Sequence, residues 1–277
     1  MTSVRIEPAA VLRPGGVERS IRPVPVESPV AIEIDGLGYA VMMMTPERFD
    51  AFATGFLLTE RLIDSPADLL AVEPFEAEAG WIVRVALAER CRGRIQDRVR
   101  HRTSDTSCGL CGLSGLEQLR RRVPTASPRP QVAQAAVFAA LEGLRDHQPL
   151  NRLTGALHAA AVCDREGRIV EAAEDVGRHN ALDKLIGALA MDGRPIGGFL
   201  LVTSRLSFEM VDKALVAGAP MLVGVSAATS LAIDHARAHG LTLIALARSD
   251  AMLALNDPWG AFDAVAEEGL EPPTRGL

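Results

Sequence analysis

Apolar residues in the second half of the chain form three short runs separated by amphipathic segments. The runs are GFLLVTS, PMLVGVS and LTLIALA, and such uncharged runs are typical of strands that are buried on both faces. The segments between them, SFEMVDKALVAG and TSLAIDHARAHG, have helical periodicity, and each ends at a glycine. This order predicts a βαβαβ unit with a parallel sheet.

Further elements are predicted upstream of this unit. Residues 131–146 predict a helix, and LHAAAVCDREGRIVEAA predicts two strands joined by a turn. NALDKLIGALA predicts another helix, whose leucines face the core. Cys163 ends the first of these strands and is expected to be a small buried residue. The second half of the chain is therefore expected to have an α/β fold with a partly parallel sheet flanked by helices.

The first half of the chain has a different pattern. PVAIEIDGLGYAVMMM alternates around Asp35-Gly36 and predicts a β-hairpin. Thr45 followed by Pro46 predicts the start of a helix with an apolar face, and WIVRVALA predicts another strand. Residues 1–28 contain four prolines with little periodicity and predict an irregular arm.

A proline-containing connection, VPTASPRP, predicts a domain boundary near residue 128. We therefore expect an arm over residues 1–28, a smaller N-terminal α+β domain over residues 29–128 and a C-terminal α/β domain over residues 129–277. The chain has 277 residues, of which 48% are hydrophobic, and this is enough for two cores.

Composition indicates a cytoplasmic protein. Only two of the four cysteines are close together, which makes no disulfide framework and indicates a reducing compartment. The N-terminus lacks the apolar region of a signal peptide. The run ALVAGAPMLVGVSAATSLAI has roughly the length of a membrane span, but glycines, a proline and hydroxyl groups interrupt it. We therefore expect no membrane partner.

The predicted parallel strands bring polar side chains to one edge of the sheet. In open α/β sheets, ligands bind at the carboxyl ends of the strands. Hydroxyl groups, guanidinium groups and two helix N-termini meet there, which suits a phosphorylated ligand, although the hydroxyls equally suit simple helix capping. The chain has no Walker loop and no strand-borne GxGxxG, so neither a P-loop ATPase nor a Rossmann dehydrogenase is indicated. The strand ends contain Thr203, Ser204, Arg205, residues 226–230, Arg248, Ser249 and Asp250.

The formal net charge of −6 conceals a strongly basic segment. Ten arginines and three acids lie between Arg90 and Arg129, so this segment carries +7 and the rest of the chain −13. Such a segment is either a solvated basic surface or a binding surface for a phosphate-bearing ligand or an acidic partner. Cys108 and Cys111 lie within it.

The spacing of Cys108 and Cys111 fits three common chemistries poorly. A structural zinc site requires four ligands, and no second pair with ligand spacing is available. A thioredoxin-like protein places its pair at a strand-to-helix turn early in the fold. A zinc deaminase requires His-x-Glu upstream of its cysteines, whereas His158 lies downstream and is followed by Ala160 in place of Glu. We therefore expect no metal.

Thiol chemistry on a glycine-flanked loop remains. The surrounding arginines favour a thiolate, which is the nucleophilic form of cysteine. Such a thiolate can take up sulfur as a persulfide and pass it on. Cys91 lies between arginines and has no partner at a useful spacing.

Five motifs in order resemble those of the formate dehydrogenase accessory sulfurtransferases of the FdhD type. The resemblance spans about residues 25–247 and also includes TPERFDAFATGFLLTE. It implies that the C-terminal domain is similar to cytidine deaminases without their zinc. The five motifs are SCGLCG (107–112), TGALHAAAV (154–162), EDVGRHNALDKLIG (174–187), TSRLSFEMVDKA (203–214) and VSAATSLAI (225–233).

The resemblance also implies a reaction. Proteins of this family take sulfane sulfur from a cysteine desulfurase and deliver it to the molybdenum or tungsten of a bis(molybdopterin guanine dinucleotide) cofactor, which then enters formate dehydrogenase. The resemblance places the persulfide on Cys108 and makes Cys111 the assisting thiol. Arg178 and His179 open a helix and are expected to address phosphate or the dithiolene region, although His179 equally suits a capping role. The family and the apolar strands indicate a homodimer.

The chain departs from the family after its last strand. The family usually reads Gly-Phe-x-Arg-Gly-x-Arg there, a stretch assigned to the guanine dinucleotide. This chain lacks the ring, the glycine and the second arginine and adds an acid, which changes cofactor affinity or identity unless the arginines near the cysteines compensate. The residues expected to bind the cofactor here are Leu246, Ala247, Arg248, Ser249, Asp250 and Ala251.

Three functions follow from these features. The leading hypothesis is a sulfurtransferase that acts on the molybdenum cofactor. A second is a chaperone that holds the dinucleotide cofactor for an apo-enzyme without transferring sulfur. A nucleic-acid binder that uses the arginine-rich segment is disfavoured, because an aromatic content of 4% offers few stacking platforms, and we expect no nucleic-acid partner.

Overall fold

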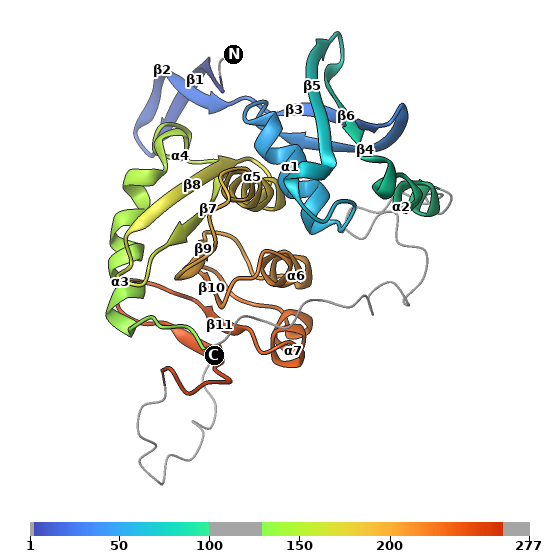
Figure 1. The fold of residues 1–277 in the computed structure, drawn as a ribbon. Helices are drawn as coiled ribbons and strands as arrows, with labels where there is room; N and C mark the ends of the chain where they lie inside the picture. The colour runs from blue at the N-terminus through green and yellow to red at the C-terminus, as the bar shows by residue number, and fades with distance from the viewer. Residues whose placement is uncertain (1–2, 100–128, 263–277) are drawn as a thin grey trace.

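A mixed six-stranded sheet forms the centre of the larger part of the molecule (Figure 1). The computed structural model describes residues 3–99 and 129–262. The predicted βαβαβ unit is confirmed, because β9, β10 and β11 are parallel neighbours, whereas β7, β8 and β12 add antiparallel pairs. The sheet order is β12-β11-β10-β9-β7-β8. The strands are β7 (His158–Cys163), β8 (Ile169–Asp175), β9 (Phe199–Val202), β10 (Met221–Gly224), β11 (Thr242–Ala245) and β12 (Leu253–Asn256).

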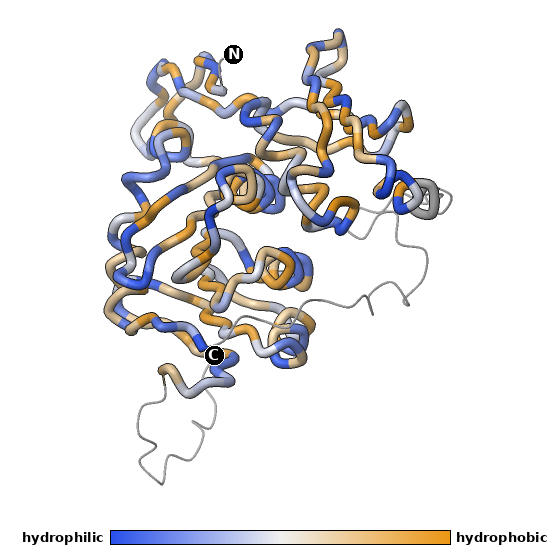
Figure 2. Tube along the Cα trace, in the orientation of Figure 1, coloured by the Kyte–Doolittle hydropathy of each residue, from blue (hydrophilic) through white to orange (hydrophobic). Residues whose placement is uncertain are grey.

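Helices cover both faces of this sheet (Figure 1). Alternate residues of each strand face opposite sides, so Leu200 and Val202 pack toward α5, α6 and α7, whereas Phe199 and Leu201 pack toward α3. In Figure 2, α6 and α7 are hydrophobic toward the sheet and hydrophilic on the outer side. One face carries α5 (Arg178–Met191), α6 (Phe208–Val216) and α7 (Ser230–Ala238), and the other α3 (Gln134–Gly143), the 3-10 helix η3 (Leu144–His147) and α4 (Pro149–Thr154).

A four-stranded sheet of order β4-β3-β6-β5 forms the second core. The predicted hairpin at Asp35-Gly36 is confirmed, and both residues have positive φ angles of 47° and 79°, as a tight two-residue hairpin turn requires. The elements of this part are β3 (Ser28–Ile34), β4 (Leu37–Met44), α1 (Phe49–Thr59), the 3-10 helix η1 (Pro66–Asp68), β5 (Leu69–Ala77), β6 (Gly80–Leu87) and α2 (Glu89–Val99).

The prediction of an irregular arm over residues 1–28 is wrong. Two strands, β1 (Val4–Arg13) and β2 (Gly16–Pro25), form an antiparallel hairpin of their own. The strands were not predicted because prolines usually indicate irregular structure. Each strand of a two-stranded ribbon has one unpaired edge, and the missing N–H of a proline does no harm there.

The predicted start of α1 at Thr45-Pro46 is also wrong. The helix begins at Phe49, and its N-cap residue Arg48 has a left-handed φ of 56°. Thr45 does not cap the helix, because its N–H donates to the Asp175 carboxylate and its carbonyl accepts from Lys184. The second half of the chain thus fixes the segment that precedes α1.

Helices α1 and α5 cross in close backbone contact and join the two cores. A Cβ atom at Gly55 would lie 1.8 Å from the carbonyl oxygen of Asp183, and one at Gly187 would lie 1.8 Å from that of Ala51. Only glycine fits at both positions. The division of the chain near residues 28 and 128 remains a prediction. Among the described residues, no helix is long and apolar enough to cross a membrane.

Candidate functional site

The loops after β9, β10 and β11 lie side by side, as the topology predicts. The N–H of Leu206 donates to the carbonyl of Ala227 at 3.0 Å, and the N–H of Leu246 donates to the carbonyl of Ser226 at 3.1 Å. The N–H of Ala247 donates to the carbonyl of Gly224 at 3.0 Å. These backbone bonds fix a surface that we call the carboxyl edge, formed by residues 203–207, 226–229, 246–251 and the first turn of α5.

The starts of β7 and α5 complete this edge. Because β7 is antiparallel to both β8 and β9, the strand ends Asp175 and Val202 lie at the same edge of the sheet. His158 pairs with Asp175, and the Thr203 hydroxyl accepts the N–H of Ala159 at 2.9 Å. The predicted residues Arg178, His179, Thr203, Ser204 and Arg205 therefore lie on one surface.

The hydroxyl groups of this surface have different roles. Thr229 caps α7, because its side chain accepts the N–H of Ala232. At this helix the hydroxyl therefore has the capping role that the sequence left open. The buried Ser204 hydroxyl donates to the carbonyl of Arg205 at 3.1 Å. Ser207, the N-cap residue of α6, has a buried hydroxyl without a hydrogen-bond partner among the described residues. Ser207 is not among the residues that the sequence predicts for this site.

Two histidines at the carboxyl edge are neutral at pH 7. Burial, followed by the charge of Arg178, lowers the pKa of His158. Burial, followed by the charges of Lys213 and Arg178, lowers the pKa of His179 to about 3. The charge of Arg178 therefore acts on both histidine rings, and the charge of Lys213 acts on His179.

Two buried nitrogen atoms at the start of α5 have no hydrogen-bond partner in the described part of the chain. They are Nε of Arg178 and Nε2 of His179, and the N-cap residue Gly177 has no side chain to cap the helix. An unsatisfied buried polar group costs about 1–3 kcal/mol. A ligand with anionic or hydrogen-bonding groups would satisfy both atoms, together with the free N–H groups of the first turn.

Three guanidinium groups on this surface have no carboxylate partner. Arg178, Arg205 and Arg248 form no ion pair with any residue of the described ranges, and Arg205 and Arg248 are exposed. Guanidinium groups match phosphate in a planar, bidentate geometry. The carboxyl edge is therefore a positively charged surface that suits a phosphorylated ligand.

A fully buried ion pair orients the first turn of α5. The Lys184 ammonium lies 2.7 Å from the Asp175 carboxylate, and both side chains are inaccessible to solvent. Asp175 also accepts the N–H of Gly177 at 2.8 Å and the Asn180 amide at 3.1 Å. Burial raises the pKa of Asp175, and the charge of Lys184 opposes this effect. The network fixes the backbone from which His179 projects.

A second buried network is centred on Asp183, the residue that precedes Lys184 in α5. The Lys213 ammonium donates to both oxygens of Asp183, at 2.8 and 2.9 Å, and to the Thr59 hydroxyl at 2.8 Å. Asp183 also accepts from Thr59 at 2.8 Å. This network joins α1, α5 and α6 and places the charge of Lys213 close to His179.

The altered stretch 246–251 leads from β11 toward β12 at the carboxyl edge. Leu246 has a left-handed φ of 49°, and Ala247 is buried. The N–H of Arg248 donates to the carbonyl of Ala251 at 2.9 Å, which closes a turn. Arg248, Ser249, Asp250 and Ala251 are exposed, so the side chains that replace the family pattern face solvent.

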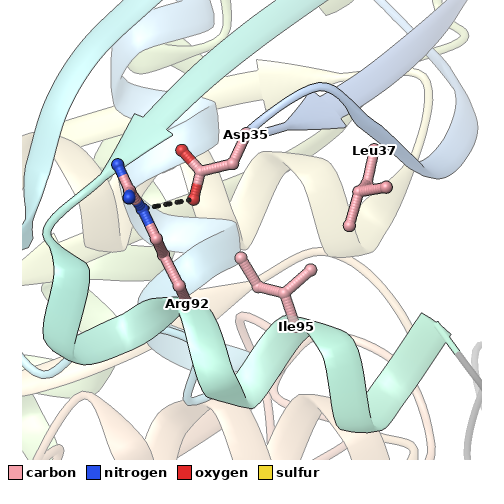
Figure 3. A pocket seen from close by; sticks show the side chains of 4 residues that line it. All are labelled: Asp35, Leu37, Arg92 and Ile95. Carbon is pink, nitrogen blue, oxygen red and sulfur yellow. Dashed lines mark ion pairs between the residues drawn. The ribbon is translucent and has the colours of Figure 1, made fainter.

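Cys108 and Cys111 lie outside the described residues. The described start of the basic segment is largely neutralised by ion pairs. The Arg92 guanidinium lies 3.5 Å from the Asp35 carboxylate. Leu37 and Ile95 line the same pocket, which has a volume of about 460 Å³, and the four side chains are drawn in Figure 3. Arg90 pairs with Asp68, and Arg94 with Asp64, each at 2.7 Å. Each of these three arginines therefore has a carboxylate partner within the N-terminal part of the molecule.

The two described cysteines are structural. Cys163 is buried, as predicted, and burial raises its pKa to about 12. Cys91 is fully buried in the core of the four-stranded sheet, and burial, followed by the charge of Asp68, raises its pKa. Neither thiol ionises at pH 7. Within residues 3–99 and 129–262, no three His, Cys, Asp or Glu side chains are grouped to hold a metal ion.

Sequence reasoning missed the two lysines beneath this site. Lys184 lies among apolar residues in NALDKLIGALA, and Lys213 follows the apolar positions of SFEMVDKA. A charge on the apolar side of a predicted helix is a signal of a buried pair. The partners Asp175 and Asp183 could not be assigned without the packing of α5 against α1 and α6.

Comparison with known proteins settles the family. Residues 25–259 match the sequence profile described as the FdhD/NarQ family. The chain belongs to the FdhD/NarQ family. Its motifs at residues 107–112, 154–162 and 174–187 lie within the matched region.

Several relatives of the FdhD/NarQ family are similar over most of their length. A protein named "Sulfur carrier protein FdhD" from Bordetella parapertussis is 45% identical over 224 residues, which cover 80% of this chain and 81% of the relative. The protein of the same name from Variovorax paradoxus is 41% identical over 262 residues, which cover 90% and 94%.

A solved structure has a similar fold. It is described as "a putative formate dehydrogenase accessory protein" from Desulfotalea psychrophila, and it superimposes with a TM-score of 0.73. The match covers 93% of this chain and 98% of that one at 24% sequence identity. The mixed α/β architecture described above is therefore shared with that protein.

Proposed function

We propose that this protein is a sulfurtransferase that accepts sulfur as a cysteine persulfide and delivers it to the molybdenum of a bis(molybdopterin guanine dinucleotide) cofactor required by formate dehydrogenase. The observation that supports it most is the carboxyl edge, which presents three unpaired guanidinium groups and two unsatisfied buried nitrogen atoms in one surface. Similarity to proteins named sulfur carrier supports the same role.

The proposed sulfur transfer has two balanced steps. The Cys108 thiolate attacks the sulfane sulfur of a cysteine desulfurase persulfide, which releases the desulfurase thiolate and leaves a persulfide on Cys108. The Cys111 thiolate then attacks the Cys108 sulfur, which forms a Cys108–Cys111 disulfide and releases hydrosulfide to the metal. A thiol reductant restores the two thiols.

The cofactor is the substrate in this proposal, and the carboxyl edge fits its chemistry. Its pyrophosphate groups suit Arg178, Arg205 and Arg248. The neutral His179 offers one hydrogen bond from its unpartnered Nε2, and Thr203 adds a hydroxyl. This set binds and orients the cofactor, whereas the thiols of Cys108 and Cys111 carry the sulfur.

The stretch from Leu246 to Ala251 is the proposed contact for the guanine end of the cofactor. It keeps Arg248 and lacks the aromatic ring and the second guanidinium that the family pattern supplies. The exposed Asp250 adds a negative charge beside Arg248. We therefore expect weaker binding of the guanine dinucleotide here than in relatives that have the full pattern.

The proposed reaction involves several partners. They are a cysteine desulfurase as sulfur donor, apo formate dehydrogenase as recipient of the cofactor, and a second copy of the chain in a homodimer. A cytoplasmic location is consistent with these partners. The similarity of the C-terminal part to cytidine deaminases remains a prediction.

Intact mass spectrometry tests the sulfur step. The purified chain is incubated with a cysteine desulfurase and cysteine, and we expect a mass increase of one or more sulfur atoms. The increase is expected to vanish in Cys108→Ala and to remain in Cys163→Ala, since the Cys163 thiol is buried and protonated. An unchanged wild-type mass would contradict sulfur transfer.

A second function, cofactor carriage without sulfur transfer, is favoured by one observation. Arg178, Arg205 and Arg248 suit phosphate groups, and binding of this kind requires no thiol chemistry. In that case Cys108→Ala still activates formate dehydrogenase, and Arg205→Ala does not. Activation assays of both variants with apo formate dehydrogenase distinguish the two functions.

A further inference from the structure

Helix α7 ends in a pair of histidines. His235 lies near the end of the helix, and His239, four residues later, is its C-cap residue. Side chains at this spacing are neighbours on one side of a helix. The two ring centroids are 4.6 Å apart, and the ring planes are inclined by 63°. Neither histidine belongs to the carboxyl edge, so the proposed cofactor binding does not account for the pair.

Hydrogen bonds fix which nitrogen of each ring carries the proton. Nε2 of His235 lies 3.2 Å from the Asp212 carboxylate, and Nδ1 of His239 lies 3.0 Å from the carbonyl oxygen of His235. A carboxylate and a carbonyl only accept hydrogen bonds, so both of these nitrogen atoms donate. In the neutral rings, the lone pairs are therefore on Nδ1 of His235 and on Nε2 of His239.

These contacts are the ones that metal-binding histidines make. A histidine that binds a metal ion donates its second N–H to a carboxylate, a backbone carbonyl or water, which fixes the orientation of the ring. His235 has the carboxylate, and His239 has the carbonyl. The Arg61 guanidinium holds the Asp212 carboxylate with two hydrogen bonds of 2.8 and 2.9 Å. The Phe208 ring packs against His235, with centroids 4.3 Å apart. Both rings are therefore oriented before any ion binds.

The two lone pairs are open to solvent. The described residues include buried nitrogen atoms without a hydrogen-bond partner, as at Arg178 and His179, but Nδ1 of His235 and Nε2 of His239 are not among them. Since the hydrogen bonds within the described ranges use only the other nitrogen of each ring, both atoms reach water. An ion can therefore bind them from solution, although the His235 residue as a whole is only 8% exposed.

The distance between the rings fits one shared ion. A zinc-like ion lies about 2.1 Å from an imidazole nitrogen and thus about 3.2 Å from the ring centroid. Two rings that bind the same ion at an angle of about 90–110° then have centroids about 4.5–5.2 Å apart. The observed separation of 4.6 Å lies within this range.

The donor atoms select the class of ion. Imidazole nitrogen atoms suit zinc, nickel and copper ions, whereas magnesium and calcium ions require oxygen ligands. Both oxygens of Asp212 are already bound to Arg61, so the two histidines are the protein ligands and water fills the remaining positions. Among these ions, copper(II) is expected to bind most tightly.

We propose that His235 and His239 form a binding site for one divalent transition-metal ion of the zinc, nickel and copper class. The ion joins Nδ1 of His235 to Nε2 of His239 and stabilises the end of α7. Because His235 also donates to Asp212 on α6, the ion strengthens the contact between two helices that begin at the carboxyl edge. The site does not depend on the proposed sulfur transfer.

Isothermal titration calorimetry with nickel chloride tests the site. The full chain is used without a histidine tag and with Cys108→Ser and Cys111→Ser, because those thiols would also bind nickel. We expect one ion per chain, no competition from excess magnesium chloride, and at least about tenfold weaker binding when His239→Ala is added. His147→Ala is the matched control, because it removes an exposed histidine outside the pair, and it is expected to leave nickel binding unchanged.

Thermal unfolding provides a second readout. Nickel is expected to raise the unfolding midpoint of the chain with both serines, and to have a smaller effect when His239→Ala is added. The proposal is overturned if that chain binds no nickel up to about 1 mM. It is also overturned if His239→Ala, with an unchanged circular dichroism spectrum, binds nickel as tightly as its parent. Neither result bears on sulfur uptake, so the proposed function is tested separately.

Discussion

At the start of α5, Arg178 and His179 each have a buried nitrogen atom without a hydrogen-bond partner among the described residues, which costs free energy in the folded protein. The surrounding structure is highly ordered, since Asp175, Lys184 and Asn180 satisfy one another. Unsatisfied atoms beside a fully satisfied network are typical of a binding surface that is kept open for a ligand.

The depressed pKa of His179 makes stability depend on pH. Its value in the folded protein is about 3, against an ordinary value of 6.5. The unfolded chain therefore binds one more proton between these values, so this contribution to stability is complete above pH 6.5 and is lost as the pH falls toward 3. The slope is at most about 1.4 kcal/mol per pH unit. His179→Gln is expected to reduce the slope by up to this amount.

Urea denaturation at pH 6.5 and at about pH 4.5 measures this slope. His147→Gln is the control, because His147 is exposed and its replacement is expected to leave the slope unchanged. Equal slopes in the wild type and in His179→Gln would show that His179 titrates normally in the folded protein.

Among the elements, α1 and α5 have the closest contact. Gly55 and Gly187 let the two backbones touch, and the Lys213 network adds α6 to the same junction. The junction ties α5, one turn after His179, to α6, whose N-cap residue is Ser207. Its geometry therefore sets the distance between the starts of α5 and α6 at the carboxyl edge.

Replacement of Gly187 by alanine tests this junction. A Cβ atom there would lie 1.8 Å from the carbonyl oxygen of Ala51, so the helices must separate. We expect Gly187→Ala to lower the free energy of unfolding by about 1–3 kcal/mol or more. Gly143→Ala, at the end of α3 with open space around it, is expected to be neutral or stabilising by up to about 1 kcal/mol. Urea denaturation of both variants measures the difference.

The loop from Leu246 to Ala251 is expected to affect the binding of guanine nucleotides. Ala251→Arg restores one guanidinium of the family pattern on an exposed position. A charge-assisted hydrogen bond to phosphate contributes about 1.5–3 kcal/mol, so we expect GDP to bind at least about tenfold more tightly. Isothermal titration calorimetry with GDP measures the change.

A control variant distinguishes a local contact with the nucleotide from a general effect of added positive charge. Ala238→Arg adds the same charge at an exposed position of α7. If GDP binds Ala251→Arg and Ala238→Arg equally well, the loop is not the contact for the guanine nucleotide.

At the scale of the whole molecule, the two cores behave as one structure because α1 packs against α5 and because Thr45 is bound to Asp175 and Lys184. We expect a single thermal transition whose calorimetric and van't Hoff enthalpies agree. Gly187→Ala is expected to broaden or split this transition. Differential scanning calorimetry checks this, and two separate transitions in the wild type would contradict it.

The sequence was sufficient for the parallel unit and for the surface at its carboxyl edge. Uncharged apolar runs of this kind clearly predict strands that are buried on both faces. Because these strands are parallel, their carboxyl ends, which carry Thr203 and Arg248, lie at the same edge of the sheet. Strands β5 and β12 were not predicted. The first contains Pro74 and acidic residues, and the second has only four residues, two of them exposed. The buried pairs of Lys184 and Lys213 depend on contacts between helices that no local pattern records.

The backbone hydrogen bonds across the carboxyl edge have an evolutionary consequence. The amides of Leu246 and Ala247 hold the last loop to the carbonyls of Ser226 and Gly224, and amide bonds of this kind are available to every residue except proline. The attachment of the loop thus does not depend on which side chains residues 248–251 carry. Mutation can exchange the groups at residues 248–251 without disturbing the scaffold, so ligand preference can diverge here while the rest of the protein stays the same.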